Sequence, residues 1–571
     1  MKPVRLFAVM LLYSSSVFSQ KPKITWGDEF KLHKGSTDLD VLSADKSGVY
    51  LQESHLALKS YFVIGASVRE SATLIKLDNN LSELYHNDFN KELRGKEFEE
   101  FFALQNKIFI IASDYSKRDR ALSVYGAEVD KSSGELASGW TPLITLQKDE
   151  KKDEIRFKIV PNSDSTRIVL VSSVEGKEKN TYQIQEFDNR LNPSAKPVTI
   201  ANEFDPKTFQ LQDVVYTNTR KILLVGRIYE YEEGKKKKDK FLDFVNYNIR
   251  LYDETGKQQA EVNTDINGKW LMSTKVFQKD DKDLVLTAFY SNEKRGKSID
   301  GMLVERIDPV SGNVLSTSEK EINNSLLTAA SDSSGDESAD DETKAERKER
   351  ERLDKIKDEG EGFSRYMKFR NIFYTSDGGI IVLAEHYHHY SYTTSSYTPG
   401  TNGTGYWSNT TYYVYECGDI LMTKIDAAGN LSWLKVLPKS QREVTSDGSS
   451  TGFFTTDFFD FGNRPFYAGF GAMQTNGIVN ILFNDNPKNA EVTQPGQRVK
   501  LTNRFGKSDC FIVSLDELTG KYTRNQFFSN AEVPTAMPRL GSVIGDNMYI
   551  TGKDDRLFGK TKIAVAKIAV R

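Results

Sequence analysis

The sequence has few of the residues that stabilise small disulfide-rich folds. Two of its 571 residues are cysteine, Cys417 and Cys510, so a disulfide framework is excluded. The formal net charge of -3 excludes the strongly basic surface of a general nucleic-acid-binding protein. After residue 19, no apolar run approaches the roughly 18 residues of a membrane-spanning helix. We therefore expect no nucleic-acid partner and no transmembrane segment.

Catalytic signatures are also missing. The chain contains no GxSxG, no HExxH and no P-loop motif, and Gly469-Phe470-Gly471 lacks the third glycine of a dinucleotide fingerprint. The sequence thus predicts no catalytic residue and no cofactor, and it favours a binding protein over an enzyme.

The first nineteen residues are typical of a signal peptide. Lys2 and Arg5 precede a short apolar core, and Val17 and Ser19 are small enough for the peptidase subsites. We expect cleavage before Gln20 and a mature, exported chain over 20–571, in the periplasm rather than at the cell surface.

One phrase recurs along the chain, an apolar strand that ends in Asp and is followed by a tight turn that often contains Gly. Asp starts such turns because its carboxylate accepts a hydrogen bond from the backbone two residues on. We interpret these residues as turn-formers rather than as catalytic or metal-binding groups: Asp78, Asp130, Asp188, Asp253, Asp308, Asp426 and Asp516.

A second apolar strand precedes each copy of that phrase, as in KIFIIAS (107–113), RIVLVSS (167–173) and GIIVLAE (379–385). With weaker strands on either side, each unit has four strands, here called a, b, c and d. Four antiparallel strands repeated every 40–50 residues or so predict an all-β fold, a β-propeller. We count eight blades, with seven as the alternative because the first unit (39–89) is irregular.

The two ends of the chain complement each other. The last unit stops after KIAVAKIAVR (562–571) and has no d strand of its own, whereas KITWGDEFKL (23–32) is an apolar strand without a unit. We predict that 23–32 pairs with 562–570 and closes the ring, which removes exposed sheet edges.

Long insertions fall on one face of the predicted propeller. The a–b and c–d turns are short, whereas the b–c loops 229–246, 386–418 and 485–508 and the d–a tracts 324–362 and 440–456 are long. For the charged tract 324–362 we expect a disordered acidic part followed by an exposed helix. Clustered long loops favour a binding face, although loop drift is the alternative.

The tract 386–418 is rich in aromatic residues set among Ser, Thr, Gly and Asn, a composition that suits a protein or glycan surface. A long hairpin that packs its tyrosines against itself is the equal alternative. We predict a binding surface made by Tyr390, Tyr392, Tyr406, Trp407, Tyr412 and Tyr413, with Trp407 as the anchor.

Histidines in the same tract are weak candidates for a metal site. His386 and His388 lie two apart, and a third ligand would have to be His389 or Glu416, but no ligand spacing is recognisable. We therefore expect no metal.

Cys417 and Cys510 are placed near the same end of neighbouring c strands, and we expect them not to be bonded.

The phrase GIIVLAEHY followed by GDILMTKIDAAGNLSWLKVL resembles the propeller repeats of secreted bacterial proteins of Bacteroidetes type. That resemblance implies a binding or scaffold module of the cell envelope. AEVDKSSGELASGW (127–140) has a weaker resemblance to quinoprotein dehydrogenases, but their recurring tryptophans are missing.

We expect an exported, non-catalytic binding or scaffold propeller for a protein or glycan. The alternatives are a quinoprotein-like or glycan-active enzyme and a structural subunit of an envelope complex.

Overall fold

The computed structural model of the chain describes residues 22–33, 36–62, 65–202, 204–229, 244–264, 268–278, 283–293, 298–322, 363–364, 366–399, 405–446, 464–554 and 562–569. The expected signal peptide (1–19) and the charged insertion (324–362) lie outside these residues. None of the helices in the described ranges combines the length and the apolar character needed to cross a membrane.

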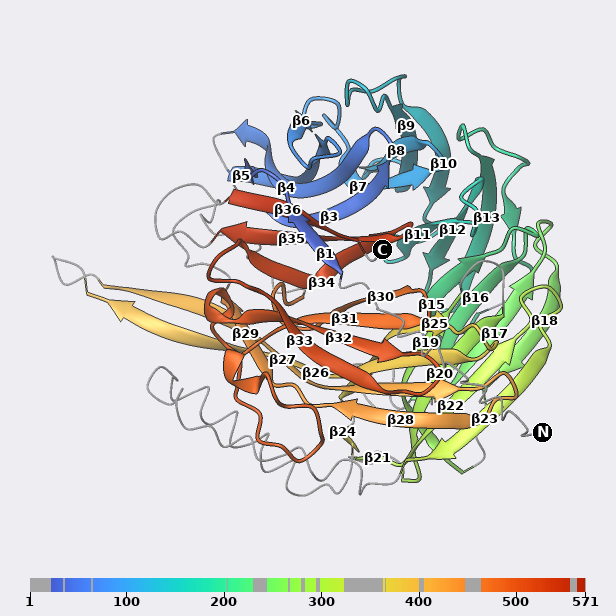
Figure 1. Ribbon diagram of the computed structural model, residues 1–571. Coiled ribbons are helices and arrows are strands. Elements are labelled where there is room, and N and C mark those ends of the chain that lie inside the picture. Colours follow the sequence, from blue (N-terminus) through green and yellow to red (C-terminus); the bar gives the residue numbers. More distant parts are fainter. Residues whose placement is uncertain are drawn as a thin grey trace, which may run out of the picture.

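Over the described residues the chain forms eight antiparallel sheets built on four strands each, which we number 1 to 8 in chain order (Figure 1); sheets 6 and 8 each carry one additional strand, β29 and β2. Sheets 1 and 2 contain β3 (Ser36–Asp45), β4 (Gly48–Phe62), β5 (Gly65–Leu77), β6 (Glu83–Asp88), β7 (Glu97–Leu104), β8 (Lys107–Ser116), β9 (Ala121–Val129) and β10 (Thr141–Gln147). Sheets 3 and 4 contain β11 (Glu154–Pro161), β12 (Arg167–Glu175), β13 (Asn180–Asp188), β14 (Val198–Thr199), β15 (Phe209–Tyr216), β16 (Ile222–Tyr229), β17 (Phe244–Tyr252) and β18 (Gln258–Asn263).

The second half of the chain repeats this plan. Sheets 5 and 6 contain β19 (Trp270–Phe277), β20 (Leu284–Ser291), β22 (Gly301–Ile307), β23 (Val314–Glu321), β25 (Met367–Tyr374), β26 (Ile380–Thr398), β27 (Tyr406–Ile425), β28 (Leu431–Leu437) and β29 (Gln441–Ser446). Sheets 7 and 8 contain β30 (Gly471–Thr475), β31 (Ile478–Asp485), β32 (Asp509–Asp516), β33 (Tyr522–Ser529), β34 (Thr535–Ile544), β35 (Asn547–Asp554), β36 (Lys562–Ala569), β1 (Lys23–Trp26) and β2 (Phe30–Lys31). The short strands β21 (Ser298–Ile299) and β24 (Phe363–Ser364) pair with each other.

The repeated phrases of the sequence are the two middle strands of the sheets. KIFIIAS, RIVLVSS and GIIVLAE lie in β8, β12 and the first part of β26, and the phrases that end in Asp lie in the strands paired with them. Four-stranded antiparallel sheets repeated in this way are the architecture of a β-propeller. The irregular unit 39–89 contributes one four-stranded sheet, in which the long strands β4 and β5 pair with each other.

The turn aspartates form the predicted backbone hydrogen bonds. The Asp130 carboxylate accepts from the backbone N–H of Ser132 at 2.7 Å, and Asp253 accepts from that of Thr255 at 2.9 Å. In these two turns the glycine that follows, Gly134 or Gly256, has a φ of 74° or 75°. Glycine is favoured there because a side chain strains this left-handed conformation. The interpretation of the aspartates as turn-formers is confirmed.

The two ends of the described chain lie side by side, as the sequence predicts for segments 23–32 and 562–570. β1 pairs antiparallel with β36 from Lys23 opposite Ala569 to Trp26 opposite Ala566. β2 pairs with the other end of β36, with Phe30 opposite Ile563. The N-terminal segment therefore completes sheet 8, which the C-terminal strands begin.

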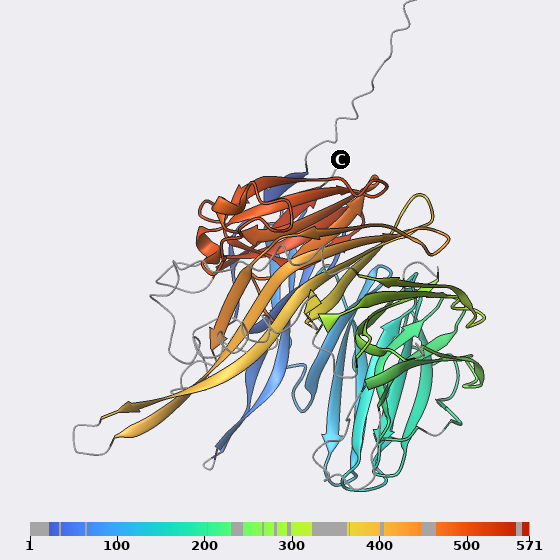
Figure 2. The same ribbon diagram turned by 90° about the horizontal axis from the view of Figure 1, so that it is seen from below.

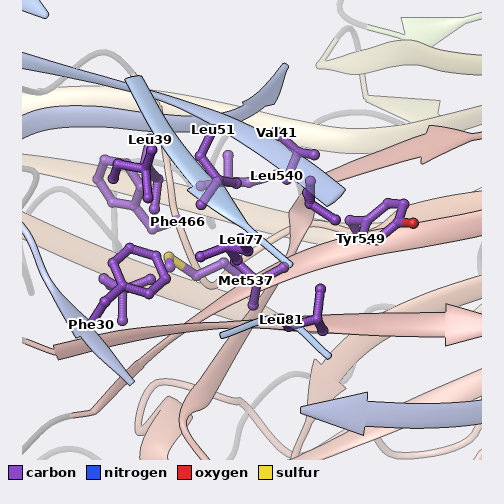
Figure 3. Close-up of a cluster of buried hydrophobic side chains, with 14 residues drawn as sticks. Phe30, Leu39, Val41, Leu51, Leu77, Leu81, Phe466, Met537, Leu540 and Tyr549 are labelled. Atoms are coloured by element: carbon purple, nitrogen blue, oxygen red, sulfur yellow. The ribbon is translucent and has the colours of Figure 1, made fainter. Parts of the chain in front are cut away.

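Apolar side chains fill the spaces between consecutive sheets. Among the described residues, eight hydrophobic clusters each combine side chains of two neighbouring sheets, and one of these unites sheet 8 with sheet 1. Figure 3 shows this last cluster, in which Phe30 of β2 and Met537 of β34 lie with Leu39, Leu51 and Leu77 of sheet 1. Sheet packing thus continues from the last sheet to the first.

Sheet 6 carries a hairpin that projects beyond the other strands. Its strands β26 and β27 pair without interruption from Tyr387 opposite Cys417 to Thr398 opposite Tyr406. Figure 2 shows them, yellow and orange, as a two-stranded ribbon outside the body of the molecule. At its base a third strand, β29, pairs with β27 between Tyr412 and Cys417. The tract 386–418 is therefore not an irregular loop but regular β-structure on both sides of its tip.

Candidate functional site

A pocket of about 180 Å³ opens between sheets 4, 5 and 6. Its lining comes from the end of β16 and from the early parts of β19 and β25, namely Arg227, Met272, Ser273, Thr274, Lys368 and Phe369. Consecutive strands of these sheets are antiparallel, so the end of a second strand, such as β16 or β26, lies at the same edge of its sheet as the start of the first strand, such as β19 or β25. The pocket therefore opens at the end of the sheets from which the β26–β27 hairpin projects.

Two β-bulges shape this pocket. The register of β19 shifts between Leu271 and Ser273, and that of β25 shifts between Phe369 and Asn371. A bulge leaves its extra residue outside the ladder and redirects its side chain. The extra residues here are Met272, which lines the pocket, and Arg370, which lies beside it in sequence and contacts a buried carboxylate.

Positive charge is concentrated around the pocket. Loss of hydration lowers the pKa of Lys368, and repulsion by the guanidinium groups of Arg227 and Arg370 lowers it further. The pKa of Lys275 is lowered in the same way, by loss of hydration and then by the charge of Arg370. Within the described part of the chain the Lys368 ammonium has no ion-pair partner, and Lys368 lines the pocket together with Arg227. Its cross-strand neighbour Glu385 is paired with other cations.

The carboxylate of Glu385 lies beside the pocket and contacts Arg370 and two further cations, Arg539 and Lys439. It is fully buried, and its oxygens lie 2.9 Å from Arg370, 3.3 Å from Arg539 and 2.8 Å from Lys439. Burial on its own would raise the pKa of this carboxyl, but the charges of the three cations outweigh it and lower the pKa to about 2. One negative charge thus faces three positive charges, and the site as a whole keeps an excess of positive charge.

Hydrogen bonds hold the cations in place at the base of the hairpin. The Lys439 ammonium donates to the Cys417 carbonyl at 3.2 Å and to the Gln441 side-chain oxygen at 2.7 Å. Gln441 in turn donates to the Asn484 carbonyl at 2.6 Å. The ring of Tyr387 lies 4.6 Å from the Arg370 guanidinium. These contacts link sheet 6 to sheet 7 and preorganise the cationic site.

The aromatic residues predicted to bind a partner do not form one cluster. The Tyr392 and Tyr412 rings stack at 5.2 Å on one face of the hairpin, and Tyr390 lies on that face. Tyr413 lies on the other face, beside His389. All four are half-buried. Part of the aromatic tract therefore packs against itself, as the hairpin alternative predicts.

The tip of the hairpin differs from its base because it is exposed. Tyr406 is 56 % and Trp407 68 % exposed, and Trp407 contacts the Tyr397 ring at 5.2 Å. Tyr397, 48 % exposed, was not among the residues that we predicted from the sequence. Tyr397 and Trp407 therefore pair on one face of the exposed end of the hairpin, and Tyr406, the next residue to Trp407, lies on the other face.

The histidines of this tract are separated by strand alternation. His386 and His388 both lie against Tyr366, and His388 Nδ1 is 3.5 Å from a Glu416 oxygen. His389 points to the other face and stacks on Tyr415 at 4.7 Å. Of the two possible third ligands, only Glu416 thus lies on the side of His388.

The two cysteines are free and buried. Cys417 packs with Ala468 and Phe505, whereas Cys510 belongs to the cluster between sheets 7 and 8. Burial raises the pKa of both thiols, that of Cys417 to about 12. A thiol of this kind is a poor nucleophile and metal ligand at neutral pH.

Sequence reasoning missed the cations of the pocket because they follow no motif. One signal was present: in MKFRNIFY (367–374) Lys368 and Arg370 alternate with apolar residues on a short strand. It also missed a group of His33, Glu53 and His86, whose nitrogen and oxygen atoms lie within 4.8 Å of one another. These three are far apart in the sequence and become neighbours only through the sheet register.

No family model and no curated protein matches this chain. Solved structures give distant similarities. The polysaccharide lyase Uly1 matches with 11 % identity and a TM-score of 0.36, over 96 % of this chain and 100 % of its own. The β-propeller domain of the Trilobed protease from Pyrococcus furiosus matches with 9 % identity and a TM-score of 0.31, over 88 % and 98 %. An α-L-arabinanase from Penicillium chrysogenum matches with 8 % identity and a TM-score of 0.29, over 52 % and 98 %.

Proposed function

We propose that the eight sheets are the blades of a single propeller that the N-terminal segment closes, and that the protein is exported and binds an acidic glycan. The observation that carries the ligand class is the pocket, whose lining includes the cations Arg227 and Lys368. The neighbouring carboxylate Glu385 is already paired with Arg370, Arg539 and Lys439. A carboxylate or sulfate group is what such a pocket recognises, because charge-assisted hydrogen bonds are strong and specific.

The size and surroundings of the pocket support a sugar polymer with spaced charges. A volume of about 180 Å³ holds one substituent rather than a whole oligosaccharide. Ser273 and Thr274 bring hydroxyl groups into the lining, and Tyr366, two residues before Lys368, begins a row of rings with His388 and Tyr390. Aromatic faces of this kind suit the apolar faces of sugar rings.

The test is a binding titration with a hexamer of galacturonic acid, with a sulfated oligosaccharide, and with neutral maltohexaose. We expect binding of the anionic sugars, weaker at higher salt, and no binding of maltohexaose. Lys368→Gln should weaken binding about tenfold or more, because one charged hydrogen bond is worth about 1.5–3 kcal/mol. Lys196→Gln is the matched control, since Lys196 is exposed in the connection between β13 and β14.

Two results would contradict the proposal. One is equal binding of neutral and acidic sugars, and the other is the same loss of affinity in Lys368→Gln and Lys196→Gln. The same samples test the enzymatic alternative, because chain cleavage creates new reducing ends. If these accumulate with the wild type and not with Lys368→Gln, the protein is a glycan-active enzyme.

A second candidate function is the capture of a protein partner by the hairpin tip. Its specific support is the exposure of Tyr406 and Trp407 at the end of a projecting ribbon. Exposed aromatic side chains away from a core are the usual anchors of interfaces. A crosslinking pull-down from the native envelope, compared between the wild type and Trp407→Ala, tests this function separately from sugar binding.

Export is part of the proposal, because residues 1–19 have the charged start, apolar core and small residues of a signal peptide. N-terminal sequencing of the protein from its native host should give Gln20 as the first residue. An intact Met1 would contradict export by this route.

A further inference from the structure

His33, Glu53 and His86 come together where the N-terminal segment passes from sheet 8 to sheet 1. His33 follows β2, which pairs with β36, and precedes β3. Glu53 lies in β4 opposite Thr73 of β5, which lies opposite Asp88 of β6. Directly paired residues share a face of the sheet, and so do residues two apart on a strand. His86, two residues before Asp88, therefore points to the same side as Glu53.

The three side chains place their ligand atoms in a nearly equilateral triangle. Glu53 Oε2 lies 3.1 Å from His33 Nδ1 and 3.3 Å from His86 Nε2, and the two nitrogens are 3.4 Å apart. Tetrahedral ligands at 2.0–2.1 Å from a zinc ion are separated by about 3.3–3.4 Å. One ion in front of this triangle would reach all three atoms at ordinary bond lengths.

Neighbouring backbone and carboxylate groups orient the ligand atoms of His33, Glu53 and His86, as the outer shell of a metal site does. The second oxygen of Glu53 accepts a hydrogen bond from the backbone N–H of His33 at 2.7 Å, which leaves Oε2 for the triangle. Behind the imidazoles, His33 Nε2 lies 3.6 Å from Asp88, and His86 Nδ1 lies 3.8 Å from Glu83. Carboxylates behind ligating histidines fix the ring orientation and raise the basicity of the ligand nitrogen.

We propose that His33, Glu53 and His86 bind a divalent metal ion, with zinc as the ion that best fits two imidazoles and a carboxylate. Water would complete the four ligands, and the Thr73 hydroxyl, 3.2 Å from His33 Nδ1, adds a polar group beside the triangle. The ion joins the N-terminal segment to two strands of sheet 1, and it locks the place where the last and first sheets meet. This site is independent of the cationic pocket and of the proposed glycan.

The proposal is tested on the full mature chain after dialysis against a chelator. Titration with zinc chloride should show one high-affinity ion per chain, and cobalt(II) should give the visible absorption of a tetrahedral site. At a free zinc concentration 100 times the Kd, the folding equilibrium should shift about 100-fold toward the folded state, which raises the Tm. Hydrogen exchange over residues 23–31 should slow when zinc is added.

His33→Asn is the informative variant because His33 is partly exposed and its replacement leaves the buried Glu53 in place. It should fold, lose the high-affinity zinc, and lose the zinc-dependent change in Tm and exchange. His86→Asn should behave in the same way. His388→Asn is the matched control, since it removes a hairpin histidine beside Glu416 and should keep both effects.

Three results would overturn the proposal. The first is a wild-type chain that binds no zinc at micromolar concentrations. The second is zinc binding that His33→Asn and His86→Asn leave unchanged. The third is a cobalt spectrum that His388→Asn abolishes, which would move the site to the hairpin. If zinc binds as expected while sugar binding fails, only the proposed function is wrong.

Discussion

The six histidines of the chain divide equally between two regions, which differ in whether the structure brings the histidine side chains together or separates them. Three follow each other closely on the β26–β27 hairpin, where strand alternation turns His389 away from His386 and His388. The other three are far apart in the sequence, yet His33 stacks on His55 at 4.5 Å and lies beside His86. Adjacent residues on a strand, such as His388 and His389, point to opposite faces, whereas the register of the sheet can bring residues that are distant in the sequence together.

The two regions also differ in what their residues do for the fold. The N-terminal segment inserts Phe30 into the cluster between sheets 8 and 1 and completes a sheet. Between the Tyr392–Tyr412 pair and its tip, the hairpin consists of β26 and β27 paired with each other, and the residues next to the tip are exposed. We therefore expect changes at the N-terminal segment to cost stability, and changes along the hairpin to cost little.

Removal of residues 20–32 should have the largest effect. It removes β1 and β2, exposes the edge of β36 and takes Ile24, Trp26 and Phe30 out of two clusters. Burial of a large apolar side chain is worth about 1.5–3 kcal/mol, so the free energy of unfolding should fall on the order of 5 kcal/mol. Urea denaturation of the truncated and the mature chain measures this loss. Equal midpoints would show that the segment is dispensable.

Glu385→Gln should have the next largest effect, because it leaves three cations at the base of the hairpin without their carboxylate. The folded-state pKa of about 2 lies below the ordinary 4.5, so this charge stabilises the fold above pH 4.5. The substitution should cost about 3 kcal/mol at pH 7. Its cost should shrink as the pH falls from 4.5 to 2, since the wild-type carboxyl is then protonated.

Urea denaturation at a series of pH values, with the exposed Glu491→Gln as control, follows this change. A cost for Glu385→Gln that stays the same at pH 7 and pH 3 would show that charge is not its source.

Shortening the hairpin should have a small effect on stability. Replacement of residues 393–411 by Asn-Gly leaves Tyr392 opposite Tyr412, next to a two-residue turn of the type that suits hairpins. It also keeps β29 paired with β27. We expect the free energy of unfolding to change by less than about 1 kcal/mol. Thermal unfolding checks this, and a loss similar to that of the N-terminal truncation would show that the hairpin tyrosines are core.

Trp407→Ala should have the smallest effect on folding, within about 0.5 kcal/mol, because the side chain is largely exposed and its ring partner among the described residues is Tyr397 of the same hairpin. If the tip captures a protein, the same change should weaken capture by about 2 kcal/mol, the cost of a hot-spot residue. Thermal unfolding and the crosslinking pull-down, run on one preparation, separate the two effects. A large fall in Tm would mean that Trp407 is structural.

Much of the fold could be predicted because its determinants are local. The apolar strand, the Asp that accepts a backbone hydrogen bond and the glycine at positive φ all lie within about ten residues, as in AEVDKSSG (127–134). The pairing of β1 with β36 could also be predicted, since one strand lacked a unit and one unit lacked a strand. Because these features recur in each unit, the repeat can be recognised in the sequence even though each single copy is a weak signal.

The cationic pocket could not be predicted, because its residues come from three sheets and depend on two bulges. A bulge at Met272 or Arg370 changes which way a side chain points, and the alternation of the sequence does not reveal it. Glu385 ends a phrase that reads as an ordinary buried strand, and its three cations lie up to 154 residues away in the chain. The triangle around Glu53 is hidden in the same way.

The pairing of Lys23 with Ala569 brings the start of β1 next to the end of β36. A connection of a few residues could therefore replace the present ends, and new ends could be opened in any short turn, such as the one at Asn476 and Gly477 between β30 and β31. Such a circularly permuted chain would keep all the described strand pairs. In that chain β1 and β2 would directly follow β36, the strand with which they pair. All strands of sheet 8 would then be contiguous in the sequence and would be synthesised one after the other.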